Sequence, residues 1–536
     1  MNHIELFAGC GGLSIGMKSA GFELTLANEV SPMAAETFAY NLLKEDLTSK
    51  NISHTFWIKS KYKKNDPSRL REDYRNIAKL PKNKVFSDIP DSRFFKALKG
   101  SLLIGDIQNL NAEITNSPAL RREIANSFGD GRVDLVSGGP PCQSFSLAGL
   151  RKHEAEKNQL PWAFAEFCSK IKPRMVLLEN VTGILRAFKV KGESHYAWFE
   201  VAKAFASKDC GYVPICLHIN ARFVGTAQNR PRFIMLCFEA PLAKKILSSG
   251  KLGINGQRIF LDSLEFLRKI QMNEDCTYNP DFYYDLNKKH PLFDEWPFNI
   301  LKENKITTKQ TESTVFDAIG DIKNVISITD SSAYVKEINK LSKSLNSLST
   351  YTKGIPLNHE LRTNNSRVKA RFRLYQVISE IPNNIIVRNI KSYIKSPELT
   401  QLSDETFQYL KSIMFLTEEG KQCLFQTKKE LEDFLISIRT KKQTQKALIA
   451  DSPAPAALSI PDDACHYDEE QLRTLTVREM ARFQSFPDKF EFRSKITTGG
   501  KMRQFEVPQY TQVGNAVPPL LARALANVCK EFLDIK

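Results

Sequence analysis

Short apolar runs alternate with helical patterns along the first 240 residues, and this alternation limits the fold more than any other feature. A chain that repeats strand and helix in this way forms an open sheet with helices on both faces, so we predict an α/β fold. The expected strands are His3–Phe7, Glu23–Asn28, Leu102–Gly105, Val133–Ser137, Met175–Glu179 and Phe233–Phe238. The expected helices include Leu13–Ala20, one opening at Ser31-Pro32, Trp162–Ile171 and Tyr196–Ser207.

Two regions interrupt this rhythm. Residues 42–99 are too long and polar for a helix-to-strand loop, so they predict an insertion at the edge of the sheet. From about residue 241 to 470 the alternation fades, which predicts a second domain. After residue 471 the pattern returns and ends in an apolar helix, Pro519–Phe532, which we assign to the first domain.

The charge balance points to a polyanionic partner. The 536 residues include 76 Lys and Arg against 60 Asp and Glu, which gives a net charge of +16. A basic surface kept only for solubility is the alternative. Ten cysteines without a Cys-x-x-Cys pair predict reduced thiols and no structural zinc site. No run of roughly 18 apolar residues and no secretion signal are present, so we expect a cytoplasmic protein without a membrane partner.

A glycine-rich turn follows the first strand. In Phe7-Ala8-Gly9-Cys10-Gly11-Gly12, glycines allow a ligand to approach the backbone, and the next helix offers free N–H groups. Glu29 ends the second strand, where an acid binds ribose hydroxyls in dinucleotide folds, and Asp106 follows the third strand. Either carboxylate taken alone is more typical of a helix cap, but together with Phe7 and Gly9 they favour an adenosine-type cofactor.

Three further segments bring reactive side chains to the same edge of the sheet. Gly138-Gly139-Pro140-Pro141-Cys142-Gln143 is a stiff turn that presents Cys142 either as a nucleophile or as a buried thiol. Glu179 ends a buried strand, where a carboxyl group can donate a proton or cap the next turn. Arg230 and Arg232 flank a proline before the last strand and can pair with Glu179 or with an anionic ligand.

In this order the segments resemble the motifs of the DNA cytosine-5 methyltransferase family, of the bacterial restriction-modification type. The matching motifs are Phe-Ala-Gly-Cys-Gly-Gly, Gly-Pro-Pro-Cys-Gln, Glu-Asn-Val, Gln-Asn-Arg-Pro-Arg, Leu-Thr-Val-Arg-Glu and Gln-Val-Gly-Asn-Ala-Val-Pro-Pro. The resemblance covers roughly residues 1–41, 101–240 and 450–536. It implies a Rossmann-like S-adenosylmethionine-dependent methyltransferase domain (1–240 and 471–536) and a smaller, mixed target-recognition domain (241–470).

The resemblance also implies a role for each matching residue. Cys142 would attack C6 of cytosine, Glu179 would enter as the neutral acid and hold N3 and the amino group, Arg232 would contact O2, and Arg230 would brace the site. The implied cofactor residues, for S-adenosyl-L-methionine, are Phe7, Gly9, Gly11, Glu29, Val30, Asp106, Ile107, Pro141, Asn515 and Val517. Gln143 and Ser146 would begin a DNA-binding loop that extends to about Asn158.

The implied substrate is duplex DNA, from which the target cytosine must flip out. The recognition sequence is not readable, although His359-Glu360-Leu361-Arg362 resembles a segment of some members. Val30 and the long 42–99 segment depart from the family pattern, and Lys59–Lys64 is either a solvated decoration or an auxiliary DNA contact. Alternatives are a tRNA methyltransferase and an inactive DNA-binding regulator. We expect a monomer, acting alone or beside a cognate restriction endonuclease.

Overall fold

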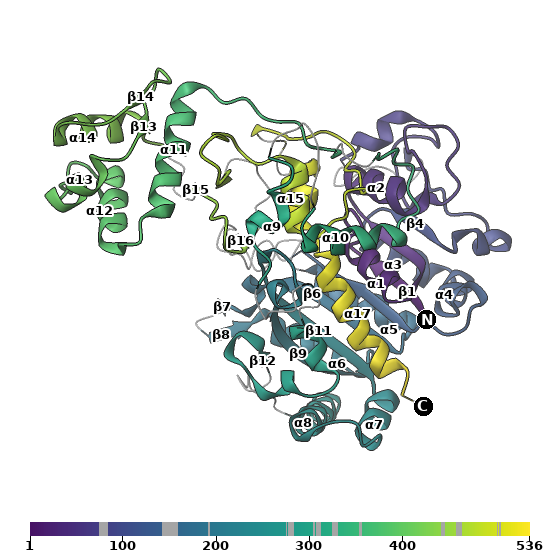
Figure 1. The fold of residues 1–536 in the computed structure, drawn as a ribbon. Coiled ribbons are helices and arrows are strands. Elements are labelled where there is room, and N and C mark those ends of the chain that lie inside the picture. Colours follow the sequence, from purple (N-terminus) through teal and green to yellow (C-terminus); the bar gives the residue numbers. More distant parts are fainter. Residues whose placement is uncertain are drawn as a thin grey trace.

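The computed structural model describes residues 1–73, 84–141, 159–190, 193–274, 276, 283–303, 306, 312–323, 331–352, 356–440, 445–456, 464–500, 502 and 505–535. Figure 1 shows an α/β body beside a smaller helical lobe. Within the described ranges, none of the helices combines the length and the apolar character that a bilayer-spanning helix requires.

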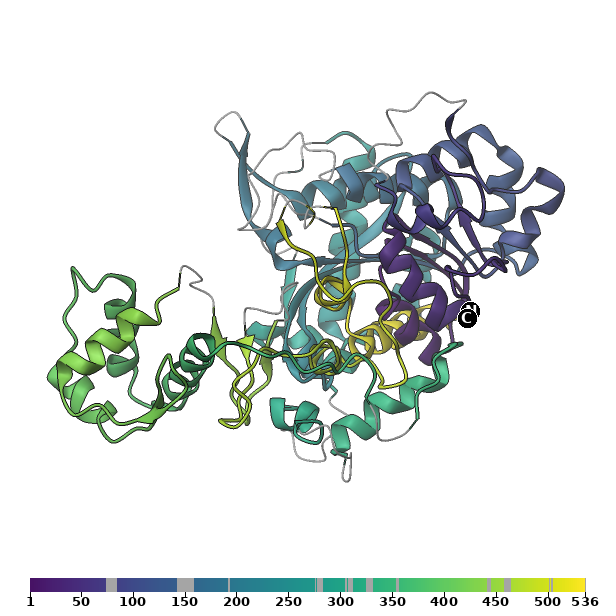
Figure 2. The ribbon, with the colours of Figure 1, turned by 90° about the horizontal axis from the view of Figure 1, so that it is seen from above.

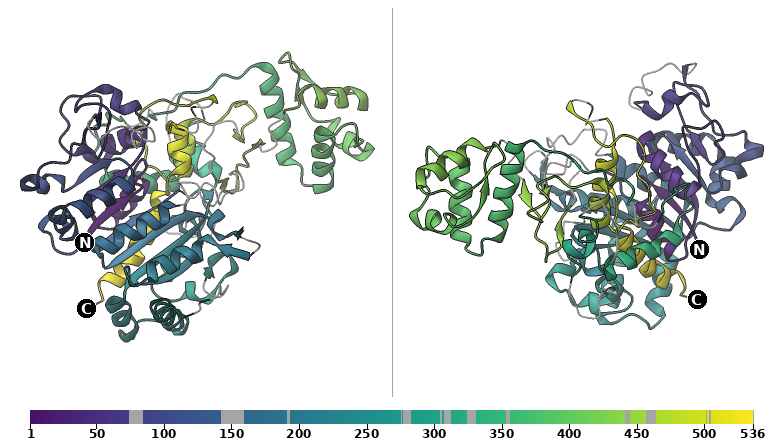
Figure 3. Two further views of the ribbon diagram at one scale, coloured as in Figure 1. Left: turned by 180° about the vertical axis from the view of Figure 1, so that it is seen from behind. Right: turned by 45° about the horizontal axis from the view of Figure 1, so that its top comes forward.

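A nine-stranded sheet forms the centre of the body, in the order β12-β9-β11-β6-β5-β1-β2-β4-β3. Its strands are β1 (Asn2–Leu6), β2 (Glu23–Glu29), β3 (Thr55–Trp57), β4 (Ser101–Ile104), β5 (Leu135–Gly138), β6 (Met175–Val181), β9 (Tyr212–Asn220), β11 (Pro231–Glu239) and β12 (Tyr283–Asp285). Only β11 runs antiparallel to its neighbours. The strands are apolar almost throughout because helices cover both faces (Figure 3).

The helices fall into an N-terminal set, an intervening set and a C-terminal set. The first comprises α1 (Gly12–Ser19), α2 (Pro32–Phe38), α3 (Ile107–Asn116), α4 (Pro118–Ala125), α5 (Leu160–Ile171) and α6 (Ala197–Ala206). The second comprises α7 (Ala240–Ser248), α8 (Ile254–Gln271), α9 (Val315–Ile319), α10 (Ala333–Lys340), α11 (Ser366–Glu380), α12 (Asn384–Lys395), α13 (Asp404–Leu410) and α14 (Lys428–Ser437). The third comprises α15 (Val477–Phe483), α16 (Gln509–Asn515) and α17 (Pro519–Leu533).

Short two-stranded ladders decorate this framework. They pair β7 (Ala187–Val190) with β8 (Glu193–Tyr196), β10 (Gln228–Asn229) with β16 (Ala454–Pro455), β13 (Phe415–Leu416) with β14 (Gln422–Cys423), and β15 (Lys446–Ala447) with β17 (Ala464–Cys465). The β10–β16 ladder returns the chain to the body after the long intervening region.

The predicted α/β fold is confirmed. All six strands expected from the apolar runs belong to the central sheet, and Ser31 caps a helix that begins at Pro32. The winding reverses between β1 and β5, and ligands bind folds of this kind at the carboxyl ends of the strands on either side of such a reversal. The sheet therefore directs the loops after β1, β2, β4, β5 and β6 toward one edge.

Residues 42–99 supply β3, which pairs with β4 and forms one border of the sheet. Behind β3, the guanidinium of Arg69 forms an ion pair with Asp88 and stacks 5.1 Å from the centre of the Trp57 ring. The described part of this segment, residues 42–73 and 84–99, is therefore a folded layer with its own buried charge pair.

The region from 241 to 470 has three parts. Its first part, α7 to residue 303, packs on the body: β12 joins the central sheet beside β9, and α8 packs against β9. The second part contains α9 and α10, which pack against each other, and α9 also packs against α15. The third part, residues 366–438, projects away from the body as the helical lobe (Figure 2) and has its own core around Leu374, Ile390, Leu431 and Phe434. The α/β pattern therefore continues beyond the boundary that we predicted at 241.

Candidate active site

The glycine-rich turn after β1 binds the carboxylate at the end of β2. The Gly9 N–H donates to Glu29 Oε2 at 2.8 Å, and the Ser31 N–H donates to Glu29 Oε1 at 2.7 Å. Burial raises the pKa of Glu29, while these two hydrogen bonds oppose the change. Phe7 and Gly9 both have a φ of 55°, which opens the turn so that a ligand can approach its backbone.

Two glycines of α1 allow the last helix to approach the same turn. A Cβ on Gly12 would lie 2.4 Å from the carbonyl oxygen of Val517, and one on Gly16 would lie 2.3 Å from the Cβ of Ala522. α1 and α17 consequently pack along each other in Figure 1. The close approach places Asn515, at the end of α16, and Val517, just before α17, beside the residues that follow β1.

The turn after β4 contributes Gly105, Asp106 and Ile107. Asp106 caps α3, because its Oδ1 accepts from the Gln108 N–H at 2.7 Å. The capping role that we considered for Asp106 is thus real, and Asp106 nevertheless borders the site.

One cavity of about 430 Å³ runs along the carboxyl ends of these strands. Its size lies within the roughly 300–1,000 Å³ that is usual for small-molecule sites. The predicted residues that line it are Phe7, Gly9, Glu29, Val30, Asp106, Ile107, Pro141, Glu179, Arg230, Arg232, Asn515 and Val517. Gly11 lies beneath the turn instead, where a Cβ would lie 2.5 Å from the Leu42 side chain.

Glu179 and Arg232 form an ion pair in the wall of the cavity. Glu179 Oε1 lies 2.7 Å from Arg232 Nε, and both side chains are about one-tenth exposed. Residues 181 and 232 are paired in the β6–β11 ladder, so the sheet register places the arginine beside the carboxylate. The β6–β11 ladder thus holds a charged pair at the cavity wall.

Gly139 and Asn180 fix the carboxylate relative to the turn after β5. A Cβ on Gly139 would lie 2.9 Å from Glu179 Oε2, so only glycine leaves that oxygen in place. The Asn180 amide donates to the Pro140 carbonyl at 2.9 Å. The Gly-Gly-Pro-Pro turn and the Glu-Asn-Val strand are therefore bound directly to each other.

Arg230 is almost fully buried and braces the C-terminal segment. Its Nη2 donates to the carbonyl oxygens of Gly514 and Ala516 at 2.8 and 2.9 Å. Burial lowers the pKa of Arg230, and the charge of Arg232 acts in the same direction. Arg230 therefore joins the strand that carries Arg232 to the backbone on both sides of Asn515.

Cys142, Gln143 and Ser146 lie outside the described residues, as does the loop predicted to extend to Asn158. Pro141, the residue before Cys142, lines the cavity. The thiol of Cys10 lines the cavity too, but Cys10 is buried and its Sγ lies 3.8 Å from the Gln512 carbonyl. Burial raises the pKa of the Cys10 thiol, so it stays protonated near neutral pH.

Sequence reasoning missed several residues of the cavity wall. Phe505, Glu506 and Val507 border the cavity from the segment before α16, and Glu5 lies at the cavity wall with its carboxyl hydrogen-bonded to Ser14. Burial raises the pKa of Glu5 to about 8. The Phe505 segment has no local signal, whereas the position of Glu5 on β1, two residues before Phe7, offered one.

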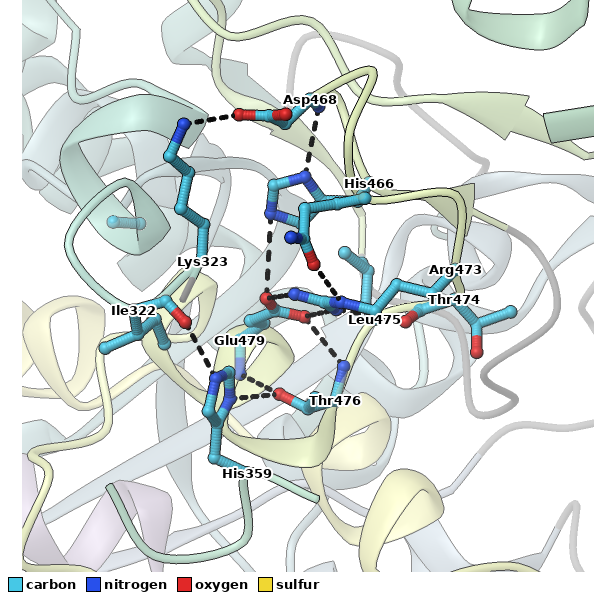
Figure 4. A network of polar contacts seen from close by, with 12 residues as sticks. Ile322, Lys323, His359, His466, Asp468, Arg473, Thr474, Leu475, Thr476 and Glu479 are labelled. Atoms are coloured by element: carbon cyan, nitrogen blue, oxygen red, sulfur yellow. Dashed lines mark hydrogen bonds and ion pairs between the residues drawn. The ribbon is translucent and has the colours of Figure 1, made fainter. Parts of the chain in front are cut away.

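The Leu-Thr-Val-Arg-Glu motif lies outside the cavity, in a buried network (Figure 4). Glu479 accepts two hydrogen bonds from Arg473, at 2.7 and 2.9 Å, and one from the Thr476 N–H at 2.8 Å. His359 contacts the Thr476 hydroxyl at 2.8 Å and the Ile322 carbonyl at 2.8 Å. Burial opposes ionisation of Glu479, but the hydrogen bonds from Arg473 and nearby cations outweigh it and lower the pKa to about 2.

This network anchors the helical lobe to the body. Gln376 of α11 donates to the carbonyl oxygens of His466 and Asp468 at 3.0 and 2.8 Å, and Asp468 pairs with Lys323 at 2.7 Å. His466 Nε2 lies 3.7 Å from Glu479 Oε1. His359, the first residue of the His359-Glu360-Leu361-Arg362 segment, is therefore a buried part of this network.

Comparison with known proteins identifies the family of this site. The family model described as C-5 cytosine-specific DNA methylase matches residues 1–67 and 92–531. Similar curated proteins include the type II methyltransferase M.DdeI of Desulfomicrobium norvegicum, 25% identical over 98% of this chain and 88% of the relative. M.Bpa9945I of Bacillus paralicheniformis is 25% identical over 99% of both chains, and M.AgeI of Thalassovita gelatinovora is 24% identical over 99% of both.

The family model covers most of the chain and includes every segment that lines the cavity; the protein therefore belongs to the C-5 cytosine-specific DNA methylases and is a DNA cytosine methyltransferase.

Proposed function

We propose that this protein transfers a methyl group from S-adenosyl-L-methionine to C5 of a flipped-out cytosine in a specific duplex DNA sequence, through a covalent bond between Cys142 and C6. The observation that carries the proposal is the single cavity that joins the Glu29–Asp106–Asn515 wall to the Glu179–Arg232 pair. One end of this cavity suits an adenosyl group, and the other suits a polar ring.

The cavity residues fit the cofactor. Glu29 keeps lone pairs beyond the two hydrogen bonds from Gly9 and Ser31, and these can accept from ribose hydroxyls. A Cβ on Gly9 would meet open space, so the backbone turn borders room for a ligand. Phe7 and Val30 would supply apolar contacts, and Asp106, Ile107, Pro141, Asn515 and Val517 would complete the wall. When bound, the cofactor supplies an electrophilic methyl group.

The chemistry then depends on this chain's own residues. The Cys142 thiolate adds to C6 while Glu179, which pairs with Arg232 in the free protein and which we propose takes up a proton when cytosine binds, gives that proton to N3 and so offsets the negative charge that builds in the ring. C5 thereby becomes nucleophilic and takes the methyl group. Loss of the C5 proton to a base, for which we assign no residue, expels the Cys142 thiolate, and N3 returns its proton to Glu179 as the ring is restored. Arg232 holds Glu179 and contacts the cytosine O2.

DNA recognition is proposed for the region from 241 to 470, and within it chiefly for the helical lobe. The lobe projects from the body and has its own core, as a module that contacts a second face of the duplex would. Gln143 and Ser146 are proposed to contact the DNA from the cavity side. The type II relatives favour a cognate restriction endonuclease as genetic partner. We propose that the protein acts as a monomer.

Duplexes that carry 5-fluorocytosine test the covalent step, because fluorine at C5 cannot leave as a cation and the adduct accumulates. We expect the wild-type protein to form a denaturation-resistant DNA adduct in the presence of cofactor, and the Cys142→Ala variant to form none. Cys10→Ala is the matched control, since it removes the other cavity thiol and should keep the adduct. An adduct with Cys142→Ala would refute the proposal. So would an assay with labelled S-adenosylmethionine in which tRNA takes up the labelled methyl group and duplex DNA does not.

A further inference from the structure

The cavity wall at Gly105 and Asp106 is supported from behind by the segment that contains β3. The Ile58 N–H donates to the Ile104 carbonyl at 2.9 Å, which extends the β3–β4 pairing to the end of the strand. The Ile58 side chain is fully buried, and a Cβ on Gly105 would lie 3.0 Å from its Cβ. Ile58 thus packs directly against the backbone that leads into Asp106.

A second contact fixes the start of α3. Lys59 Nζ donates to Asn109 Oδ1 at 2.9 Å, and Asn109 lies in the first turn of the helix that Asp106 caps. Lys59 is half-buried, whereas Lys61, Lys63 and Lys64 are exposed. Among the four cations of the 59–64 segment, Lys59 is therefore the one held against the cofactor wall.

Asp88 and Arg69 hold β3 in place through contacts with Trp57. The Asp88 N–H donates to the Trp57 carbonyl at 2.8 Å, and Asp88 Oδ2 accepts from the Trp57 N–H at 3.2 Å. Arg69 pairs with Asp88, donates to the Tyr62 carbonyl at 2.9 and 3.1 Å, and stacks on Trp57. The family model leaves residues 68–91 unmatched, so Arg69 and Asp88 form a lock outside the shared pattern.

We propose that this layer, residues 55–60 together with Arg69 and Asp88, is a buttress that positions the Gly105–Asp106 turn and thereby sets the affinity for S-adenosylmethionine. The inference rests on the proposed cofactor. A turn held in its binding conformation loses little freedom when the ligand binds, so the buttress raises affinity without touching the ligand. Ile58 and Lys59 are positioning residues in this scheme.

The first experiment measures the dissociation constant of S-adenosylmethionine for the full-length protein by titration calorimetry without DNA. We expect Lys59→Met and Asn109→Ala each to weaken binding by about fivefold, as loss of one hydrogen bond predicts. The double variant should be no weaker than either single variant, and Lys59→Arg should retain most of the affinity. Lys61→Met, which removes an exposed cation of the same segment, is the matched control and should bind like wild type.

A second variant, Ile58→Ala, should weaken cofactor binding by roughly tenfold because the turn loses its packing partner. Thermal melting establishes whether this variant is folded, and if it is not, the Lys59 series decides. Unchanged cofactor affinity in Lys59→Met and Asn109→Ala would overturn the proposal. So would equal losses in Lys59→Met and Lys61→Met accompanied by a flatter salt dependence of DNA binding, because that result marks the segment as a DNA contact.

The result is separable from the proposed function. Wild-type protein that binds S-adenosylmethionine but leaves DNA unmethylated would refute the proposed reaction, whereas the differences among the buttress variants would still stand.

Discussion

Glu179 and Glu479 are both acids in recognisable motifs, and each is paired with an arginine, yet their surroundings differ. Glu179 makes one close contact with Arg232, and its other oxygen faces Gly139 at the cavity. Glu479 is completely buried, and Arg473 and Thr476 use both of its oxygens. A carboxylate with an unoccupied side at a cavity can exchange a proton with a substrate, whereas one enclosed by donors can only hold structure together.

The largest expected effect separates the two acids by activity. Glu179→Gln keeps the shape of the side chain but removes the acid, so kcat should fall by about 10²–10⁴-fold. The melting temperature and the affinity for S-adenosylmethionine should stay close to wild type. Single-turnover methylation of duplex DNA measures the loss of rate. Scanning calorimetry measures the melting temperature, and titration calorimetry measures the affinity for S-adenosylmethionine. A variant with near wild-type kcat would show that Glu179 is not the proton donor.

Glu479→Ala should act on stability instead. It leaves the buried Arg473 guanidinium without its partner, and loss of one member of a buried pair costs about 3–5 kcal/mol. Denaturant unfolding should show this loss, while the activity per folded molecule stays near wild type. Glu479→Gln, which keeps an acceptor for the Thr476 N–H, should lose less. A stable but inactive Glu479→Ala variant would contradict the structural role.

Gly139→Ala tests the space beside Glu179. The added Cβ would lie 2.9 Å from Glu179 Oε2 and must displace that oxygen, so we expect roughly a 10²-fold loss of kcat in a folded protein. Gly499→Ala is the control, because a Cβ there meets nothing within 4 Å. Equal kinetics in the two variants would mean that the Glu179 position tolerates movement.

The smallest effect concerns pH. Burial lowers the pKa of His466 from 6.5 to about 4. The unfolded chain therefore binds this proton at a pH where the folded chain does not, so acidification from pH 6.5 to 4 lowers stability. His466→Gln should remove this contribution, on the order of 1–3 kcal/mol, and flatten the stability curve in that window. If the curves of unfolding free energy against pH run parallel for wild type and variant, a group other than His466 takes up the proton.

Local pattern was sufficient for six of the nine strands of the sheet and for the turns at its edge. These six are recognised because burial on both faces requires continuous apolar strands. Three strands were missed: β3 because three residues carry too little pattern, β9 because Pro214 and His218 interrupt its apolar run, and β12 because it follows a region where the alternation fades. Within 471–488 the capping box of Thr476 and Glu479 is local, but the approach of His359 and His466 depends on long-range folding.

The candidate site divides in the same way. Glu29, Asp106 and Glu179 are predictable because each lies within two residues of the carboxyl end of a buried strand, and parallel strands end at one edge. The contacts of Arg230 with Gly514 and Ala516, and the place of Phe505 on the wall, join segments hundreds of residues apart. No spacing rule along one sequence contains that information.

The packing of α1 on α17 has a consequence for how the protein is made. The turn after β1 leaves the ribosome first, but the wall that contains Asn515 and Val517 is among the last segments to be synthesised. A chain that ends before residue 515 lacks this part of the cavity wall. The cavity is thus completed in one late step of synthesis, when residues 515–517 meet the turn after β1.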